Sequence, residues 1–285
     1  MIGPRAAASA LLLISIVAGT ESDRTRVDPP LMLGGYRVIA ADFHVHPAIA
    51  GGAALAPWDL VLEAQRQGLD AFALTPHNKI FPAHAGPWFS RLVGGPTVLV
   101  GEEVRAARFH LIAVGIARTV SPHQTAAAAI ADIHSQGGVA IAAHPIAEYW
   151  PAFDSAAMAA LDGSEVMHPA AYFKNAAAEF EAFYSRRPMT AIGSSDYHGL
   201  GRLGMCRTYV FAADASAPAI LDALRARRTV VYGVDGRAYG DPALVGLAEA
   251  DGRLRERVAD HADSGALVWI SRLTAVVGLI GFALL

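Results

Sequence analysis

The sequence has little of several features that would point to common classes of protein. It contains a single cysteine, Cys206, which excludes an internal disulfide and a cysteine-based zinc site. Only 17% of its 285 residues are charged, against about 25% in a typical soluble domain. The net charge is −3, whereas binding to nucleic acid normally requires a concentrated basic face. We therefore expect no nucleic-acid partner.

The two ends of the chain carry long apolar runs. Residues 1–19 place Arg5 ahead of such a run, which predicts a signal peptide or an N-terminal anchor, and a polar linker follows at 20–35. Residues 266–285 contain one charge, Arg272, and are long enough to be a candidate transmembrane helix, with a buried core helix as the alternative. We expect association with a membrane through these segments. The flanking arginines favour opposite orientations, and the extracytoplasmic side is slightly favoured.

Between the two ends, apolar runs typical of buried strands alternate with helical segments. Such alternation predicts a parallel sheet, and about two hundred residues of it favour a closed barrel over an open sheet. The stretch 237–249 is predicted to be irregular. The expected strands are 36–40, 71–75, 97–100, 111–115, 139–143, 164–167, 190–193, 208–211 and 229–232, and the expected helices are 57–67, 124–136, 175–186 and 218–227.

Histidines and acids gather at the ends of the expected strands. His44 and His46 follow the first strand two residues apart, so both side chains lie on one face. A His-x-His pair alone is a weak indication. Five separate strands end in such side chains, however, and the loops after the strands form the active site of a barrel, so we predict a metal centre. The candidate ligands are His44, His46, His77, Glu103, His110, His144, Asp196 and His198.

The types of ligand indicate the kind of metal. A mixture of imidazole and carboxylate suits zinc, manganese or iron. Eight ligands exceed the needs of one tetrahedral ion, so two or more divalent ions are implied, and Glu103 is able to bridge them. The remaining histidines are interpreted as structural or surface residues, with His168 alone considered as a pocket residue. Glu165 is left open between a residue that supports a ligand and an ordinary strand-end carboxylate. Glu102 is expected to face away from the site.

In their order along the chain, the motifs resemble those of the PHP (polymerase and histidinol phosphatase) family. The resemblance covers roughly residues 36–232 and implies a PHP-like metal-dependent hydrolase domain over 36–250. It implies an α/β fold with a distorted seven-stranded β/α (TIM-like) barrel around two or three metal ions. The motifs are Asp42-Phe43-His44-Val45-His46, Thr75-Pro76-His77-Asn78, Gly101-Glu102-Glu103, His110, Ala143-His144-Pro145 and Ser195-Asp196-Tyr197-His198.

The resemblance also distributes the ligands among the ions. It implies one site made of His44, His46, Glu103 and Asp196, a second made of Glu103, His110 and His144, and a third that uses His77 and His198. Two departures weaken the third site. Pro76 replaces the usual aspartate beside His77, and residues 47–56 contain no further ligand. We expect two well-built metal sites and a weak or absent third one. The same departures are compatible with a member of the family whose catalysis is impaired.

The resulting hypothesis is metal-assisted hydrolysis of a small phosphorylated substrate. The ions would share a water and lower its pKa, and His198 or His77 would protonate the leaving group. Lys79, Arg105, Arg108 and Arg202 are candidates to bind the phosphate, although each alone also fits an ordinary surface charge. One alternative is hydrolysis of an amide or a non-phosphate ester. Another is a membrane-tethered metal-binding module with little or no turnover. The sequence indicates no oligomeric state.

Overall fold

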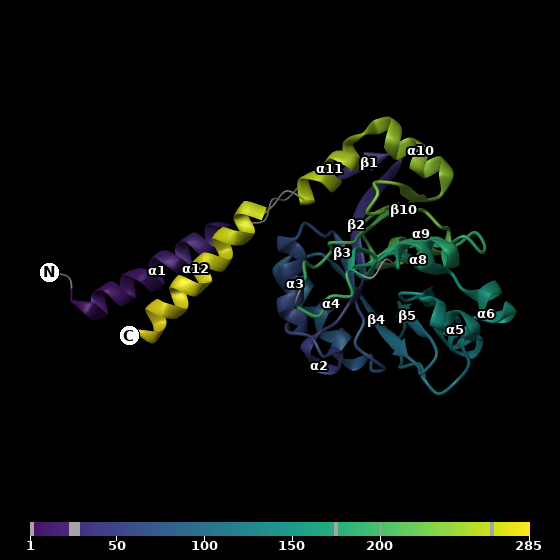
Figure 1. Ribbon diagram of the computed structural model, residues 1–285, viewed down its shortest axis with the longest axis horizontal. Coiled ribbons are helices and arrows are strands. Elements are labelled where there is room, and N and C mark those ends of the chain that lie inside the picture. Colours follow the sequence, from purple (N-terminus) through teal and green to yellow (C-terminus); the bar gives the residue numbers. More distant parts are fainter. Residues whose placement is uncertain (1–2, 23–28, 174–175, 200, 263–264) are drawn as a thin grey trace. The chain divides into compact units, whose positions relative to one another are not determined.

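A computed structural model describes residues 3–22, 29–173, 176–199, 201–262 and 265–285 (Figure 1). The chain divides into two units. The first contains both ends of the chain, Met1–Val27 and Gly252–Leu285, and the second is the continuous segment Asp28–Asp251. The predicted linker at 20–35 falls partly outside the described residues, at 23–28, and its last part forms the short strand β1 (Leu31–Leu33).

The first unit is helical. Close approaches of small residues bring two of its helices together: a Cβ added to Gly281 would lie 3.0 Å from the carbonyl oxygen of Ala8, and one on Gly278 would lie 3.2 Å from the Cβ of Ser15. The pairs run in opposite directions along the chain, so the two helices are antiparallel. Large apolar side chains such as Leu13 and Leu279 are exposed. The helices are α1 (Pro4–Ser22), α11 (Arg253–Ala262) and α12 (Gly265–Ala283).

The expected membrane segments correspond to α1 and α12. No helix in the described parts of the chain is long and apolar enough to cross a membrane. The candidate transmembrane helix at 266–285 therefore finds no support.

The second unit is built on one sheet of eleven strands within the described residues. The order is β11-β10-β9-β2-β3-β4-β5-β6-β7-β8, and β1 lies outside this order and pairs with the first residues of β2. The expectation of seven strands is therefore wrong in number, although the α/β class is confirmed. The remaining strands are β2 (Tyr36–Val45), β3 (Ala71–Leu74), β4 (Thr97–Arg105), β5 (His110–Val114), β6 (Val139–Ala142), β7 (Gly163–Met167), β8 (Thr190–Gly193), β9 (Thr208–Ala212), β10 (Thr229–Tyr232) and β11 (Ala238–Gly240).

The expected all-parallel arrangement is also wrong, and the connection between β4 and β5 is too short for a parallel crossover. A parallel pair needs a connection of about a dozen residues or more, whereas only residues 106–109 join β4 to β5. These two strands are antiparallel, as are β5 with β6 and β9 with its neighbours. The strands β2, β3 and β4 are parallel, and so are β6, β7 and β8. The sheet is therefore mixed.

Helices connect most of the parallel strands and begin where the sequence provides caps. Thr125 and Asp154 accept hydrogen bonds from the backbone N–H groups of Ala128 and Ala157, as N-cap residues do. The helices α3 and α4 lie on one side of the strands and α5 and α6 on the other (Figure 1). The helices are α2 (Ala48–Gly51), α3 (Pro57–Arg66), α4 (Ala85–Val93), α5 (Ala126–Ser135), α6 (Ser155–Ala160), α7 (Ala170–Phe173), α8 (Ala177–Tyr184), α9 (Ala217–Arg225) and α10 (Pro242–Asp251), with short 3₁₀ turns η1 (Phe81–His84) and η2 (Ala147–Ala152).

The region predicted to be irregular, 237–249, is ordered. It forms strand β11, which pairs with β10, and most of helix α10. Gly240 explains the turn between them, because its φ of 139° is open to glycine and closed to nearly every other residue. The prediction failed here because a three-residue strand is too short to show an alternating pattern.

The sheet curls into a nearly closed barrel, and side chains complete the seam. The Thr208 hydroxyl accepts a hydrogen bond from the backbone N–H of Gly193 and donates one to its carbonyl oxygen, both at 2.9 Å. The Thr229 hydroxyl donates to the carbonyl oxygen of Ala191, also at 2.9 Å. Threonine hydroxyls therefore connect β8 to β9 and β10. At the end of β2, a backbone bridge between Val45 and Tyr197 continues the closure.

Candidate metal centre

Six strand ends bring the predicted ligands together at one mouth of the barrel. His44 belongs to the end of β2, and His46 follows that strand. Backbone hydrogen bonds between His46 and Tyr197 and between Tyr197 and His44, at 3.1 and 3.3 Å, place the loop after β8 beside them. The ligands beyond β8, Asp196 and His198, therefore face those of β2 across the seam.

The remaining ligands come from the strands on the other side of β2. His77 follows β3, and a backbone hydrogen bond of 2.9 Å from Asn78 to Glu103 fixes its loop to β4. The strand β4 is longer than predicted, so Glu103 lies within it rather than after it. His110 opens β5 and His144 follows β6. All eight predicted ligands thus lie in one constellation.

Glu103 occupies the centre of this constellation, and its two oxygens face different histidines. Oε1 lies 2.7 Å from Nδ1 of His110 and 3.3 Å from Nε2 of His144. Oε2 lies 3.0 Å from Nε2 of His77 and 3.5 Å from Nε2 of both His44 and His46. The side chain is only 2% exposed. A buried carboxylate between two groups of imidazoles has the arrangement of a ligand that bridges two cations.

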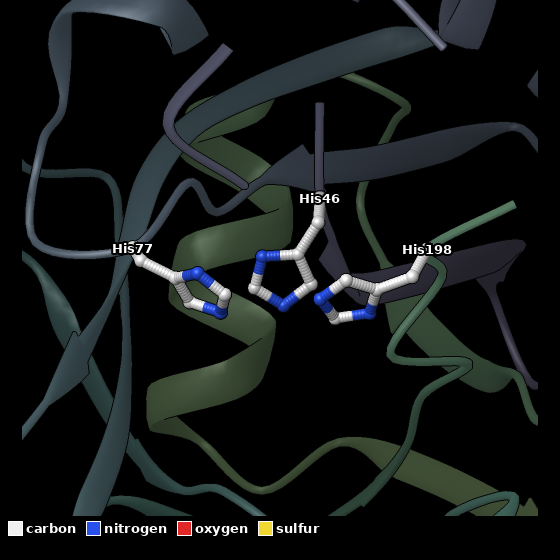
Figure 2. A group of neighbouring side chains, drawn as sticks. All are labelled: His46, His77 and His198. Carbon is white, nitrogen blue, oxygen red and sulfur yellow. The ribbon is translucent and has the colours of Figure 1, made fainter. Parts of the chain in front are cut away.

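Three groups of side chains are close enough to share a cation. In each, the ligand atoms lie within 4.8 Å of one another. Figure 2 shows one of them, in which the ring of His46 lies between those of His77 and His198, with ring centroids 4.4 and 4.2 Å away. The groups are His44, Glu103 and His144; His44, His46 and Asp196; and His46, His77 and His198.

Several of these buried ligand atoms lack a hydrogen bond, although buried polar atoms usually have one. The atoms Nε2 of His44, Nε2 of His46 and Oδ1 of Asp196 are in this state among the described residues. They nevertheless approach closely, with 2.9 Å between His46 and Asp196 and 3.4 Å between His44 and Asp196. Lone pairs that converge without an aligned proton fit a cation between them, and the imidazole and carboxylate donors suit zinc, manganese or iron.

The charges of the site favour a cation at the same place. Burial opposes protonation of His44, but the negative charges of Asp196, Glu165 and Glu103 raise its pKa well above the ordinary value. Burial likewise opposes ionisation of Asp196, yet the charge of His44 and the nearby rings of His168 and His46 hold the pKa of Asp196 below the usual range. Burial lowers the pKa of His46 to about 4. His46 therefore keeps a free lone pair at neutral pH, as a metal ligand must.

Residues outside the predicted set hold the ligands in place. Glu165 of β7 is fully buried, and its Oε1 lies 2.9 Å from Nδ1 of His44 while its Oε2 accepts the backbone N–H of His144 at 2.5 Å. The open question about Glu165 is thus answered in favour of a supporting residue. Asp42, also fully buried, accepts hydrogen bonds from both the backbone N–H and the hydroxyl of Ser195. This role of Asp42 is not evident from the sequence, although Asp42 lies two residues before the first histidine of the His-x-His motif.

The backbone is strained at two of the ligands. His144 and Asp196 have φ angles of 28° and 46°, which are uncommon outside glycine. Such strain concentrates at functional sites, where the surrounding structure must maintain it. The hydrogen bond from the His144 N–H to Glu165 and the bond from Ser195 to Asp42 supply that support.

Two cavities lie in this unit, and one of them borders the constellation. One of about 520 Å³ is lined by His144, His168 and Asp196 together with the acids Glu148 and Glu179. The other, of about 790 Å³, is lined by residues of the β4–β5 hairpin, including Arg105 and Arg108. Of the other predicted phosphate-binding residues, Lys79 is exposed, and Arg202 contacts Gln67 through its Nη2 at 3.4 Å. Neither lines these two cavities.

The chain is similar to known proteins both in part of its sequence and in its fold. A family model described as PHP-associated matches residues 175–229. A search among curated proteins found no significant match. A two-domain protein from Bacteroides vulgatus, described as containing a predicted PHP-like metal-dependent phosphoesterase, is similar in structure with a TM-score of 0.64 and 23% identity, over 79% of this chain and 73% of that one.

Two further structures are similar at lower scores. A proposed metal-dependent phosphoesterase from Bifidobacterium adolescentis has a TM-score of 0.45 and 17% identity, over 70% of this chain and 96% of that one. The lesion-specific endonuclease PfuEndoQ from Pyrococcus furiosus has a TM-score of 0.47 and 14% identity, over 70% of this chain and 60% of that one. The PHP-associated match covers residues 175–229, and the structural similarity to the Bacteroides vulgatus protein shows that the two chains share a fold.

Proposed function

We propose that this protein is a metal-dependent phosphoesterase that acts on a small phosphorylated molecule. The observation that carries the proposal is the position of Glu103, whose two oxygens face two separate groups of histidines. Two cations separated by one carboxylate are a recurring arrangement in enzymes that hydrolyse phosphate esters.

The donors divide into two sites and a weaker third. His44, His46 and Asp196 would hold one ion with Oε2 of Glu103, and His110 and His144 would hold a second with Oε1. His77 and His198 would complete a third only by sharing His46, which also belongs to the first site. When bound, the ions supply a water of lowered pKa and neutralise the charge that develops on the phosphate.

The chain's own residues position the substrate and move a proton. His198 Nδ1 lies 2.9 Å from the carbonyl oxygen of Asp196, and a carbonyl only accepts, so Nδ1 carries a proton. The opposite nitrogen, Nε2, is then free to exchange a proton with a leaving group. His198 is the most exposed ligand, at 36% of its side chain, which suits this role. His77, at 23%, is the second candidate.

Arg105 is the best supported candidate for binding the phosphate. The side-chain amide of Asn78 accepts the backbone N–H of Arg105 and donates to its carbonyl oxygen, at 2.8 and 3.1 Å. The backbone of Arg105 is therefore held beside the loop that bears His77. Arg105 and Arg108 both line the larger cavity, which includes none of the eight candidate ligands. Cavities of these sizes suit a small substrate.

The test is hydrolysis of an aryl phosphate by the purified chain with added Mn²⁺ or Zn²⁺. We expect turnover that depends on the metal and that is lost in His144→Ala. The matched control is His134→Ala, because His134 pairs with Asp162 on the surface, outside the constellation. Turnover that survives His144→Ala, or that the control also loses in a folded protein, would count against the proposal.

A second candidate is a metal-binding module without turnover. The environment of His77 favours it, since Pro76 provides no side chain to orient this imidazole and Glu103 is its polar partner among the described residues. Tight binding of Mn²⁺ without hydrolysis of phosphate esters, carboxylic esters or amides would favour this alternative. Hydrolysis of an amide or a carboxylic ester alone would instead redirect the proposal to a different bond.

A further inference from the structure

Strand β7 contributes no predicted ligand, yet it contacts ligands from three other strand ends. Glu165 holds the ring of His44 and the backbone of His144. His168, the first residue after this strand, reaches Asp196, with Nε2 at 3.3 Å from Oδ2. The role of Glu165 follows directly from its contacts. The role of His168 depends on which nitrogen of its ring carries the proton.

Backbone contacts determine which nitrogen of His168 carries the proton. The backbone N–H of Ala170 donates to Nδ1 of His168 at 3.0 Å. A backbone N–H cannot accept, so Nδ1 is the acceptor and the proton of the neutral ring is on Nε2. Nε2 is the atom that faces Asp196, and it therefore donates to Oδ2. The ring is only 7% exposed, and the edge-to-face packing of Phe180, at 5.9 Å between centroids, fixes its plane.

The two oxygens of Asp196 consequently differ. Oδ2 accepts from His168, whereas Oδ1 faces Nε2 of His46 at 2.9 Å and Nε2 of His44 at 3.4 Å and has no hydrogen bond. Asp196 also has a positive φ, so the strand geometry does not determine where its side chain points. A separate contact is needed to aim the carboxylate.

We propose that His168 is a positioning residue that occupies one oxygen of Asp196, so that this carboxylate offers a single oxygen to the cation it shares with His44 and His46. The proposal rests on the metal site of the proposed function, but not on the reaction. Groups that hold a ligand in this way contribute about 10–100-fold to metal affinity. Together, Glu165 and His168 make β7 the strand that orients the ligands of its neighbours.

The test compares the affinity for Mn²⁺ in three variants of the full chain by calorimetry, with metal content as a second measure. His168→Leu removes the donor, and we expect about 10–100-fold weaker binding at one site. His168→Gln retains an N–H group at a similar position and should recover affinity to within about threefold. His134→Leu removes another histidine–carboxylate contact, of 2.8 Å, and should bind as the unmodified protein does.

A second measurement uses the unmodified protein and does not depend on any variant folding. Long-range ¹H–¹⁵N spectra of the histidine rings, recorded with Zn²⁺, should show His168 with its proton on Nε2. A proton on Nδ1 would overturn the proposal, as would unchanged affinity in His168→Leu or equal losses in the Leu and Gln variants. If the unmodified protein binds no divalent metal, the proposed function fails with it. Normal binding without hydrolysis would refute the reaction and leave the role of His168 intact.

Discussion

Replacement of Glu165 by glutamine should disable one metal ligand without changing the shape of the core. The carboxylate now accepts two hydrogen bonds, from Nδ1 of His44 at 2.9 Å and from the backbone N–H of His144 at 2.5 Å. A glutamine side chain has only one acceptor oxygen. Because the N–H of His144 can only donate, that oxygen must face His144, and the NH₂ group must face His44.

The consequence reaches the metal site through the tautomer of His44. Facing an NH₂ group, Nδ1 of His44 must accept, so the ring proton moves to Nε2. This nitrogen lies between Glu103 and Asp196, at 3.5 and 3.4 Å, and is the atom available to a cation. We expect Glu165→Gln to weaken Mn²⁺ binding about 10–100-fold, or about 1.4–2.8 kcal/mol. Loss of a charged hydrogen bond should lower the free energy of unfolding by a further ~1.5–3 kcal/mol.

The matched control is Glu102→Gln, a second buried glutamate on the opposite face of β4. Its Oε1 accepts the backbone N–H of Val120 at 2.6 Å, away from the ligands, and a glutamine oxygen can replace it. Calorimetric titration with Mn²⁺ and urea unfolding in EDTA measure the two effects separately. Metal affinity unchanged in Glu165→Gln, or equally reduced in Glu102→Gln, would refute the reasoning.

Three further predictions concern stability in the presence of EDTA. Asp42→Asn should lower the free energy of unfolding by about 1–3 kcal/mol in urea, because Oδ1 accepts the backbone N–H of Ser195, Oδ2 accepts that of Gly204, and an amide has only one acceptor. Thr208→Val should cost a similar amount, and Thr208→Ser much less, because the hydroxyl makes two hydrogen bonds across the seam. The free energy of unfolding should fall as the pH drops below about 4. The pKa values of Glu103 and Asp196 are lowered in the folded protein, so the unfolded chain takes up protons first. Urea midpoints that rise between pH 4 and pH 3 would contradict this.

The sequence predicted the constellation better than the sheet. The His-x-His motif, the histidines after two short apolar strands and the Asp-Tyr-His motif each follow strong local signals, and the structure brings all of them together. The strands 190–193 and 229–232 also have the predicted bounds. These features depend on residues close in sequence, where the pattern is strongest.

The strand number and direction could not be obtained in the same way. Glu103 was predicted to follow a strand, but β4 continues to Arg105 and turns directly into β5, so the pair is a hairpin rather than a helix-linked unit. Pairing partners are determined by contacts distant in sequence, which local periodicity does not encode. The roles of Glu165 and His168 were missed for the same reason, since each depends on a ligand more than twenty residues away.

The position of the constellation at the seam has a consequence for the whole barrel. Asp42 and Ser195, beside the ligands of β2 and β8, are 153 residues apart in the chain and joined by hydrogen bonds. An ion held by His46 and Asp196 would fasten the same two distant segments, and closing so long a loop in the unfolded chain is entropically unfavourable. A contiguous fragment that ends before β8 contains His46 but lacks Asp196, so it cannot form this site. Metal binding by His44, His46 and Asp196 is therefore a property of the completed fold, and loading of this one site would report on whether the barrel has closed.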